Sequence, residues 1–141
     1  MNPLLNSALW LAGVGHFCVL LASFQVPARM KWREDLAKLR PVNRKLLWTY
    51  GAFIVFTIVA FGTLTLALHD ELLRGDRAAL GLAAFIGLFW LMRLVMDFTV
   101  HTHADWPSGR RFIVAHVLLV LLFSVLAATY LGLVAFYWRW P

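Results

Sequence analysis

The chain has 141 residues, of which 62% are hydrophobic and 14% charged, with a net charge of +6 and a mean hydropathy of +0.75. A soluble domain usually carries about a quarter charged residues, so this composition is typical of an integral membrane protein with one domain, residues 1–141. The positive charges lie between apolar segments. That arrangement indicates membrane orientation, and nucleic acid is therefore not expected as a partner.

Four apolar segments are long enough to cross a bilayer, which takes about 20 mostly apolar residues in a helix. No segment alternates with a period of two, so no strand is predicted. Because short connections make neighbouring helices antiparallel, we predict an all-α, integral membrane, up-down four-helix bundle. The predicted spans are Leu4–Val26, Leu46–Leu68, Ala78–Val100 and Phe112–Tyr137.

The connection between the first two spans predicts a short interfacial helix. Trp32, Leu36 and Leu39 fall on one face of it, and Glu34 is expected to pair with Lys38 four residues later. Its basic side chains suit anionic lipid headgroups, so membrane lipids are expected partners. These basic residues are Arg29, Lys31, Arg33, Lys38, Arg40, Arg44 and Lys45.

The distribution of charge also predicts the orientation of the chain. Basic connections remain in the cytoplasm, so the first and third connections are expected there. Both chain ends are then expected on the outer side of a bacterial inner membrane. In the second connection, Gly75 is predicted to end one segment and Asp76 to cap the third span.

The third predicted span ends in "LMRLVMDFTVHTH", which carries Arg93, Asp97 and His101 at intervals of four residues. Residues at this spacing share a helix face. A charge inside a membrane costs about 2.5–3.5 kcal/mol on insertion scales, so such residues face the bundle interior or a wet cavity. We therefore expect this face to line a pocket that opens toward the cytoplasmic half.

The rise of 1.5 Å per residue converts sequence position into depth in the membrane. The depths predict a deeper polar layer that joins His16 to Arg93 and a shallower layer that joins Asp97, His116 and Tyr50. Tyr50, together with His101, would then lie at the mouth of the pocket. His16, Arg93, Asp97 and His116 come from three of the spans and lie in one half of the membrane, and this convergence favours a functional site over a purely structural one.

Redox chemistry is the favoured use of such a pocket. A b-type haem would take His16 and His116 as axial ligands, although their predicted depths differ by about 9 Å. Arg93 would pair with a haem propionate or a quinone carbonyl. Because two histidines without a spacing rule fit many proteins, the cofactor stays unassigned and haem b is one possibility.

Two other chemistries remain open. Asp97, His101 and His103 form a possible metal-ligand set, because carboxylate and imidazole at i and i+4 suit a helical metal site. Asp97, His116 and Tyr50 would instead serve acid–base catalysis on a lipid or isoprenoid. No nucleophile motif accompanies them, so the sequence does not decide whether the protein is an enzyme.

The remaining alternative is structural. An Arg93–Asp97 pair can serve only to set helix register, and a small polytopic protein can be an accessory or assembly subunit of a larger membrane complex or a homo-oligomer. The favoured hypothesis is a membrane protein that binds a cofactor or a hydrophobic small molecule.

Overall fold

The computed structural model describes residues 3–100 and 109–139, and this part of the chain is helical with no strand. Its four long helices are each long and apolar enough to cross a membrane, as in a multi-pass membrane protein. The predicted all-α fold with four spans is confirmed, with helix ends shifted by a few residues. The long helices are α1 (Pro3–Ser23), α4 (Pro41–Ala67), α6 (Arg77–Thr99) and α7 (Arg110–Arg139).

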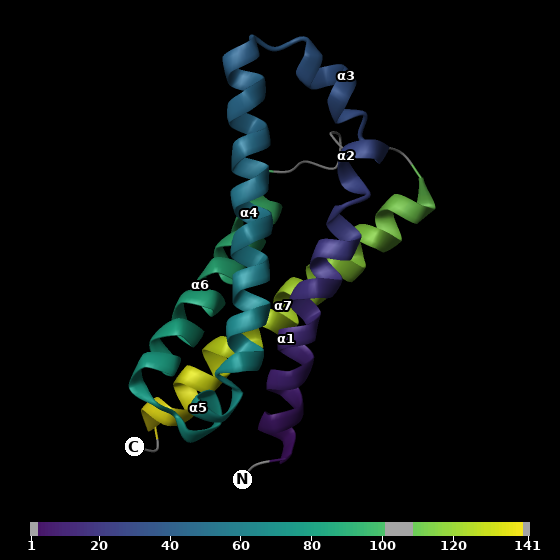
Figure 1. Ribbon diagram of the computed structural model, residues 1–141. Helices are drawn as coiled ribbons and strands as arrows, with labels where there is room; N and C mark the ends of the chain where they lie inside the picture. Colours follow the sequence, from purple (N-terminus) through teal and green to yellow (C-terminus); the bar gives the residue numbers. More distant parts are fainter. Residues whose placement is uncertain (1–2, 101–108, 140–141) are drawn as a thin grey trace.

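Three short helices lie at the two ends of the molecule. α2 (Val26–Arg29) and α3 (Trp32–Ala37) lie at the end where α4 and α7 begin (Figure 1). α5 (His69–Arg74) lies at the opposite end, close to the ends of α1 and α7 that carry the chain termini (Figure 1). The long helices thus alternate in direction along the chain, which confirms the up-down order.

The predicted interfacial helix is present as α3, but its ion pairs differ from the prediction. Lys38 donates to Asp35 at 2.8 Å, and Lys31 lies 3.8 Å from Glu34. The predicted pair of Glu34 with Lys38 is wrong, because α3 ends at Ala37 and Lys38 turns back to the residue three positions earlier. The hydrogen bond and the positive charge of Lys38 lower the pKa of the exposed Asp35 carboxyl.

The turn between α5 and α6 forms where it was predicted. Gly75 adopts a φ of +76°, a left-handed conformation that glycine accepts without steric cost. Asp76 occupies the N-cap position of α6, but its side chain makes no cap hydrogen bond and instead lies 3.3 Å from Arg74. The turn is therefore confirmed, and the predicted side-chain cap is wrong.

Glycines bring the long helices close together in two pairs. A Cβ at Gly62 of α4 would lie 2.8 Å from Phe17 and 3.1 Å from the carbonyl oxygen of Gly13, both on α1. A Cβ at Gly87 of α6 would lie 3.2 Å from the backbone nitrogen of Leu131 on α7. Small residues of this kind let membrane helices pack with their backbones near each other.

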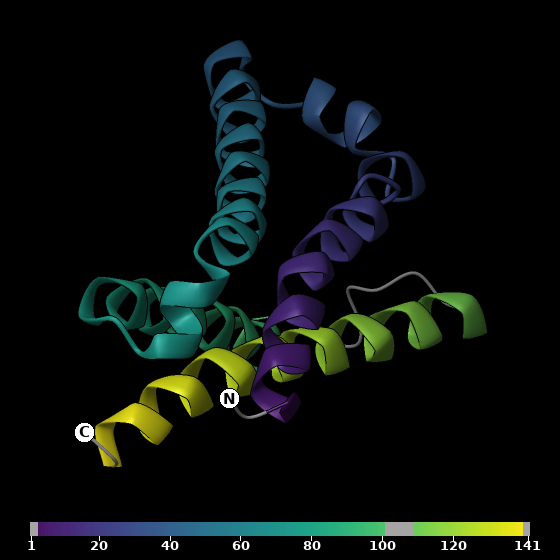
Figure 2. The ribbon, with the colours of Figure 1, turned by 60° about the horizontal axis from the view of Figure 1, so that its bottom comes forward.

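The bundle is open at one end. α1 and α4 move apart toward α2 and α3, while α6 and α7 lie below them in the view of Figure 2. The first half of α4 is exposed, as Leu46, Trp48 and Phe53 show, whereas buried residues begin at Ile58. The glycine contact with α1 is in the second half of α4, so the core lies toward the α5 end and the α2–α3 end is left open.

Candidate functional site

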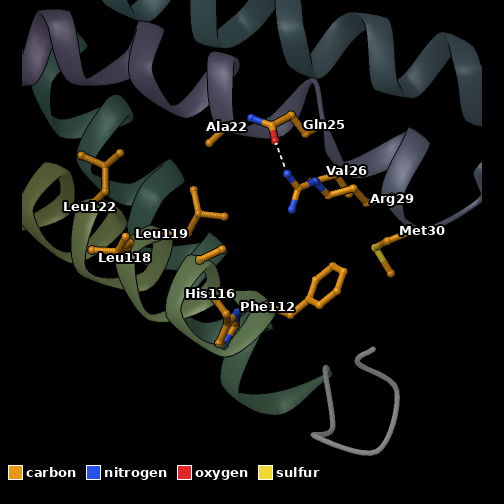
Figure 3. Close-up of a pocket in the computed structure, with 11 residues that line it drawn as sticks. Ala22, Gln25, Val26, Arg29, Met30, Phe112, His116, Leu118, Leu119 and Leu122 are labelled. Carbon is orange, nitrogen blue, oxygen red and sulfur yellow. Dashed lines mark hydrogen bonds between the residues drawn. The ribbon is translucent and has the colours of Figure 1, made fainter. Parts of the chain in front are cut away.

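A pocket of about 300 Å³ lies between the end of α1, α2 and the first half of α7 (Figure 3). Most of its wall is aliphatic or aromatic, and its polar groups are few. Ligand sites in proteins typically combine an apolar wall with a few such polar groups. The lining residues are Ala22, Gln25, Val26, Arg29, Met30, Phe112, Ala115, His116, Leu118, Leu119 and Leu122.

Arg29 and Gln25 supply the polar edge of this pocket on the α1–α2 side. Arg29 donates from Nη2 to Oε1 of Gln25 at 2.8 Å, one helical turn away. Its guanidinium is directed toward the space between α2 and α7 (Figure 3). Neither residue was predicted to belong to a site, because both stand where the first apolar segment gives way to the basic connection.

His116 supplies the polar group on the α7 side, and it connects the pocket to Asp97 on α6. Nε2 of His116 lies 3.3 Å from Oδ2 of Asp97, whose side chain is 2% exposed. The contact is a close approach of two polar atoms rather than a hydrogen bond, since this oxygen accepts none within the described residues. The structure thus brings together Asp97 and His116, two of the three residues of the predicted shallower layer.

Arg93 extends this contact to a row of three polar residues, Arg93, Asp97 and His116, which we call the polar line. It donates from Nη1 to Oδ1 of Asp97 at 3.1 Å, one turn along α6. Its guanidinium carbon lies 5.3 Å from the ring centre of Phe123. Phe123 in turn stacks on Trp90 with ring centres 4.9 Å apart. A continuous set of contacts therefore leads from the pocket into the bundle core.

His16 lies at the core end of this series of contacts, next to Trp90, and is fully buried. The indole nitrogen of Trp90 donates to its Nε2 at 3.0 Å, and its Nδ1 lies 2.8 Å from the carbonyl oxygen of Ala12. Since an indole N–H can only donate, Nε2 is the acceptor and the proton resides on Nδ1. Trp90 and Phe123 lie between His16 and Arg93. In the part of the chain that the structure describes, the direct contact of the predicted deeper layer is not formed.

The hydrogen bonds of His16 also bear on the haem hypothesis. Both ring nitrogens have partners, so ligation of an iron atom through Nε2 would break the bond from Trp90. His116 lies at the pocket, outside the fully buried cluster around His16. This geometry disfavours a haem held between the two histidines.

The structure does not bring Tyr50 to the site. It lies on the open half of α4, is 60% exposed and forms no side-chain hydrogen bond within the described residues. His101 and His103 lie outside the described residues, so the predicted metal set with Asp97 does too. In residues 3–100 and 109–139, no three side chains of His, Cys, Asp or Glu gather to hold a metal ion.

No family model, curated protein or solved structure matches this chain. The chemistry of the site therefore follows from its geometry. An apolar pocket with one guanidinium at its edge and one imidazole in its wall is suited to hold a hydrophobic molecule by a polar end. The buried Asp97 carboxylate lies behind that imidazole, with Oδ2 at 3.3 Å from its Nε2.

Proposed function

We propose that the protein binds one small hydrophobic molecule with a single polar end in the pocket between α1–α2 and α7. The observation that carries this proposal is the 300 Å³ apolar pocket whose wall includes His116, itself in contact with the buried Asp97. Ligand pockets usually measure about 300–1,000 Å³, so the space suits one small molecule.

A quinone-type redox ligand is compatible with this pocket. Its carbonyl oxygens would accept hydrogen bonds from Arg29, and its tail would lie along the leucines of α7. Haem is the weaker redox candidate because His16 is already bonded at both nitrogens.

The proposal includes a location for the pocket in a bacterial inner membrane. Nine of the 13 Lys and Arg residues lie at the end of the molecule that carries α2 and α3. By the positive-inside rule this end would be cytoplasmic, which would put the pocket in the cytoplasmic half and both termini outside. The nine residues are Arg29, Lys31, Arg33, Lys38, Arg40, Arg44, Lys45, Arg110 and Arg111.

An accessory subunit of a larger membrane complex is the second candidate. It is favoured by the exposed first half of α4, whose side chains, including Trp48 and Phe53, have no neighbouring long helix along this stretch. A lipid-modifying enzyme has less support, since Tyr50 does not accompany the pair of Asp97 and His116.

Photo-crosslinking with a palmitate analogue that carries a diazirine on its chain tests the proposal. The wild-type protein in membrane vesicles should be labelled on the facing parts of α1–α2 and α7. Leu119→Trp places a bulky ring in the pocket and should abolish this labelling. Leu121→Trp is the matched control, because Leu121 is 56% exposed on α7 and does not line the pocket.

The two candidate functions predict different outcomes. Labelling that is lost only in Leu119→Trp supports a ligand pocket. Labelling spread evenly over the lipid-facing surface, and equal in both variants, would refute the pocket. Recovery of the protein as a stable complex with another membrane protein, combined with such even labelling, would favour the accessory subunit.

A further inference from the structure

We infer that the ligand of this pocket is an anionic single-chain amphiphile whose carboxylate binds Arg29. The inference rests on the proposed function and names the chemical class of its ligand. Three features of the pocket support the inference: the positive charge at its edge, the position of its polar side chains, and its volume of about 300 Å³.

Among the described residues, the pocket has a positive edge and no acidic side chain in its lining. Arg29 is the one charged side chain among the lining residues, apart from any charge on His116. One N–H of the guanidinium is used by Gln25, and within the described residues the others have no side-chain partner. Since a guanidinium binds a carboxylate through two parallel N–H···O bonds, the free donors match an anionic head group.

The acidic residues that the structure describes at this end, Glu34, Asp35 and Asp97, are already engaged elsewhere. Glu34 lies 3.8 Å from Lys31, and Asp35 accepts from Lys38. Asp97 lies behind His116 and also accepts from Arg93.

Further positive charge stands beside the pocket. Arg110 and Arg111 begin α7 directly before Phe112, which lines the pocket. A concentration of one sign of charge at an apolar cleft attracts ligands of the opposite sign.

The arrangement of the lining also favours one chain over two. Gln25 and Arg29 lie on the α1–α2 side of the pocket, and Leu118, Leu119 and Leu122 follow His116 along α7 on the facing side (Figure 3). A volume of about 300 Å³ is at the lower end of the range for ligand pockets, which suits a single chain better than a two-chain bilayer lipid.

The experiment compares oleate with oleyl alcohol, which has the same chain and no charge. Binding is measured on the full-length protein in phosphatidylcholine nanodiscs. Oleate should bind at least about tenfold more tightly than the alcohol, as expected for a charged hydrogen-bonded contact. Arg29→Gln should remove this difference. Arg33→Gln, which changes an exposed arginine of the same basic segment outside the pocket, should leave it unchanged.

Each other outcome has a defined meaning. Equal binding of oleate and oleyl alcohol, or an oleate affinity that Arg29→Gln does not change, would overturn the anionic ligand but leave the pocket in place. Tighter binding of decylubiquinone than of oleate would also overturn it, in favour of a quinone. Displacement of oleate by phosphatidylglycerol at equal concentration would show a bilayer lipid as the occupant.

Failure of the proposed function itself has a separate signature. If neither compound binds, or if Leu119→Trp binds both as the wild-type protein does, the pocket is not a ligand site. The comparison of acid with alcohol uses the wild-type protein alone, so it tests the inference even where a variant does not fold.

Discussion

His16 shows how a polar residue is accommodated in the middle of this bundle. A buried imidazole is costly unless both nitrogens have partners, and here they are supplied by the indole of Trp90 and the carbonyl oxygen of Ala12. Tyr130 and Thr65 follow the same pattern. Thr65 donates to the carbonyl oxygen of Phe61 at 2.7 Å, so the hydroxyl of Tyr130, also 2.7 Å away, donates to Thr65. These bonds join α1 to α6 and α4 to α7.

Trp90→Phe should destabilise the fold. The variant keeps an aromatic ring beside Phe123 but removes the N–H that reaches His16, so Nε2 is left buried without a donor. The expected loss is about 1–3 kcal/mol in the free energy of unfolding. Thermal unfolding in a mild detergent measures it. Trp138→Phe is the control, since Trp138 is 85% exposed, and an unfolding temperature shared by both variants would contradict the assigned bond.

Asp97→Asn separates a functional role of the polar line from a structural one. The variant removes the charge that faces both Arg93 and His116 and should weaken crosslinking of the palmitate analogue, because the imidazole in the pocket wall loses the carboxylate beside it. The cost in stability should be modest, since the amide oxygen of asparagine can still accept the hydrogen bond from Arg93. Asp70→Asn, an exposed acid at the opposite end, is the control. A large loss of stability with unchanged labelling would indicate a purely structural pair.

At the scale of elements, the molecule is built from two helix pairs that depend on glycine. Gly62 brings α4 against α1, and Gly87 brings α6 against α7. In lipid the apolar surface of a helix gains little from burial against another helix, so close backbone packing supplies much of the association.

Gly62→Ala should therefore separate α1 from α4. Its Cβ would lie 2.8 Å from Phe17 and 3.1 Å from a backbone oxygen that cannot easily move. Overpacking of this kind costs about 1–3 kcal/mol, and thermal unfolding measures the loss. Gly51→Ala is the matched control on the same helix, since nothing lies within 4 Å of its Cβ position. Equal stability of the two variants would show that this contact does not hold the pair together.

At the scale of the whole molecule, the nine basic residues at the α2–α3 end predict the orientation in the membrane. A phosphatase that is active only outside the cytoplasm, fused after Arg139, should therefore be active. The same enzyme inserted after Lys38 should be silent, because that site lies in the basic connection. The reverse pattern would place the pocket in the outer half and refute the proposed orientation.

The sequence predicts the spans well, because hydropathy over about 20 residues is a strong signal. Depth counting also predicted that Asp97 and His116 would meet. It was misleading for Tyr50, which has a similar depth but stands where α4 diverges from α6 and α7. Depth does not report the angle at which helices cross.

Two kinds of residue could not be found by counting polar groups within spans. Trp90 looks like an apolar residue in the sequence, although its N–H is the donor that binds His16. Arg29 and Gln25 join the pocket because α1 is followed by the short helix α2, which turns these side chains toward α7. Pro27 near the start of α2 signals a new helix in the sequence, but not the direction in which its side chains point.

The most direct test of the central claim is a native mass spectrum of the full-length protein released gently from its membrane. The account predicts that the wild-type protein carries one small molecule at a one-to-one ratio and that Leu119→Trp carries none, while Leu121→Trp resembles the wild type. Bare protein in all three samples, or the same bound lipids in all three, would contradict a ligand pocket between α1–α2 and α7.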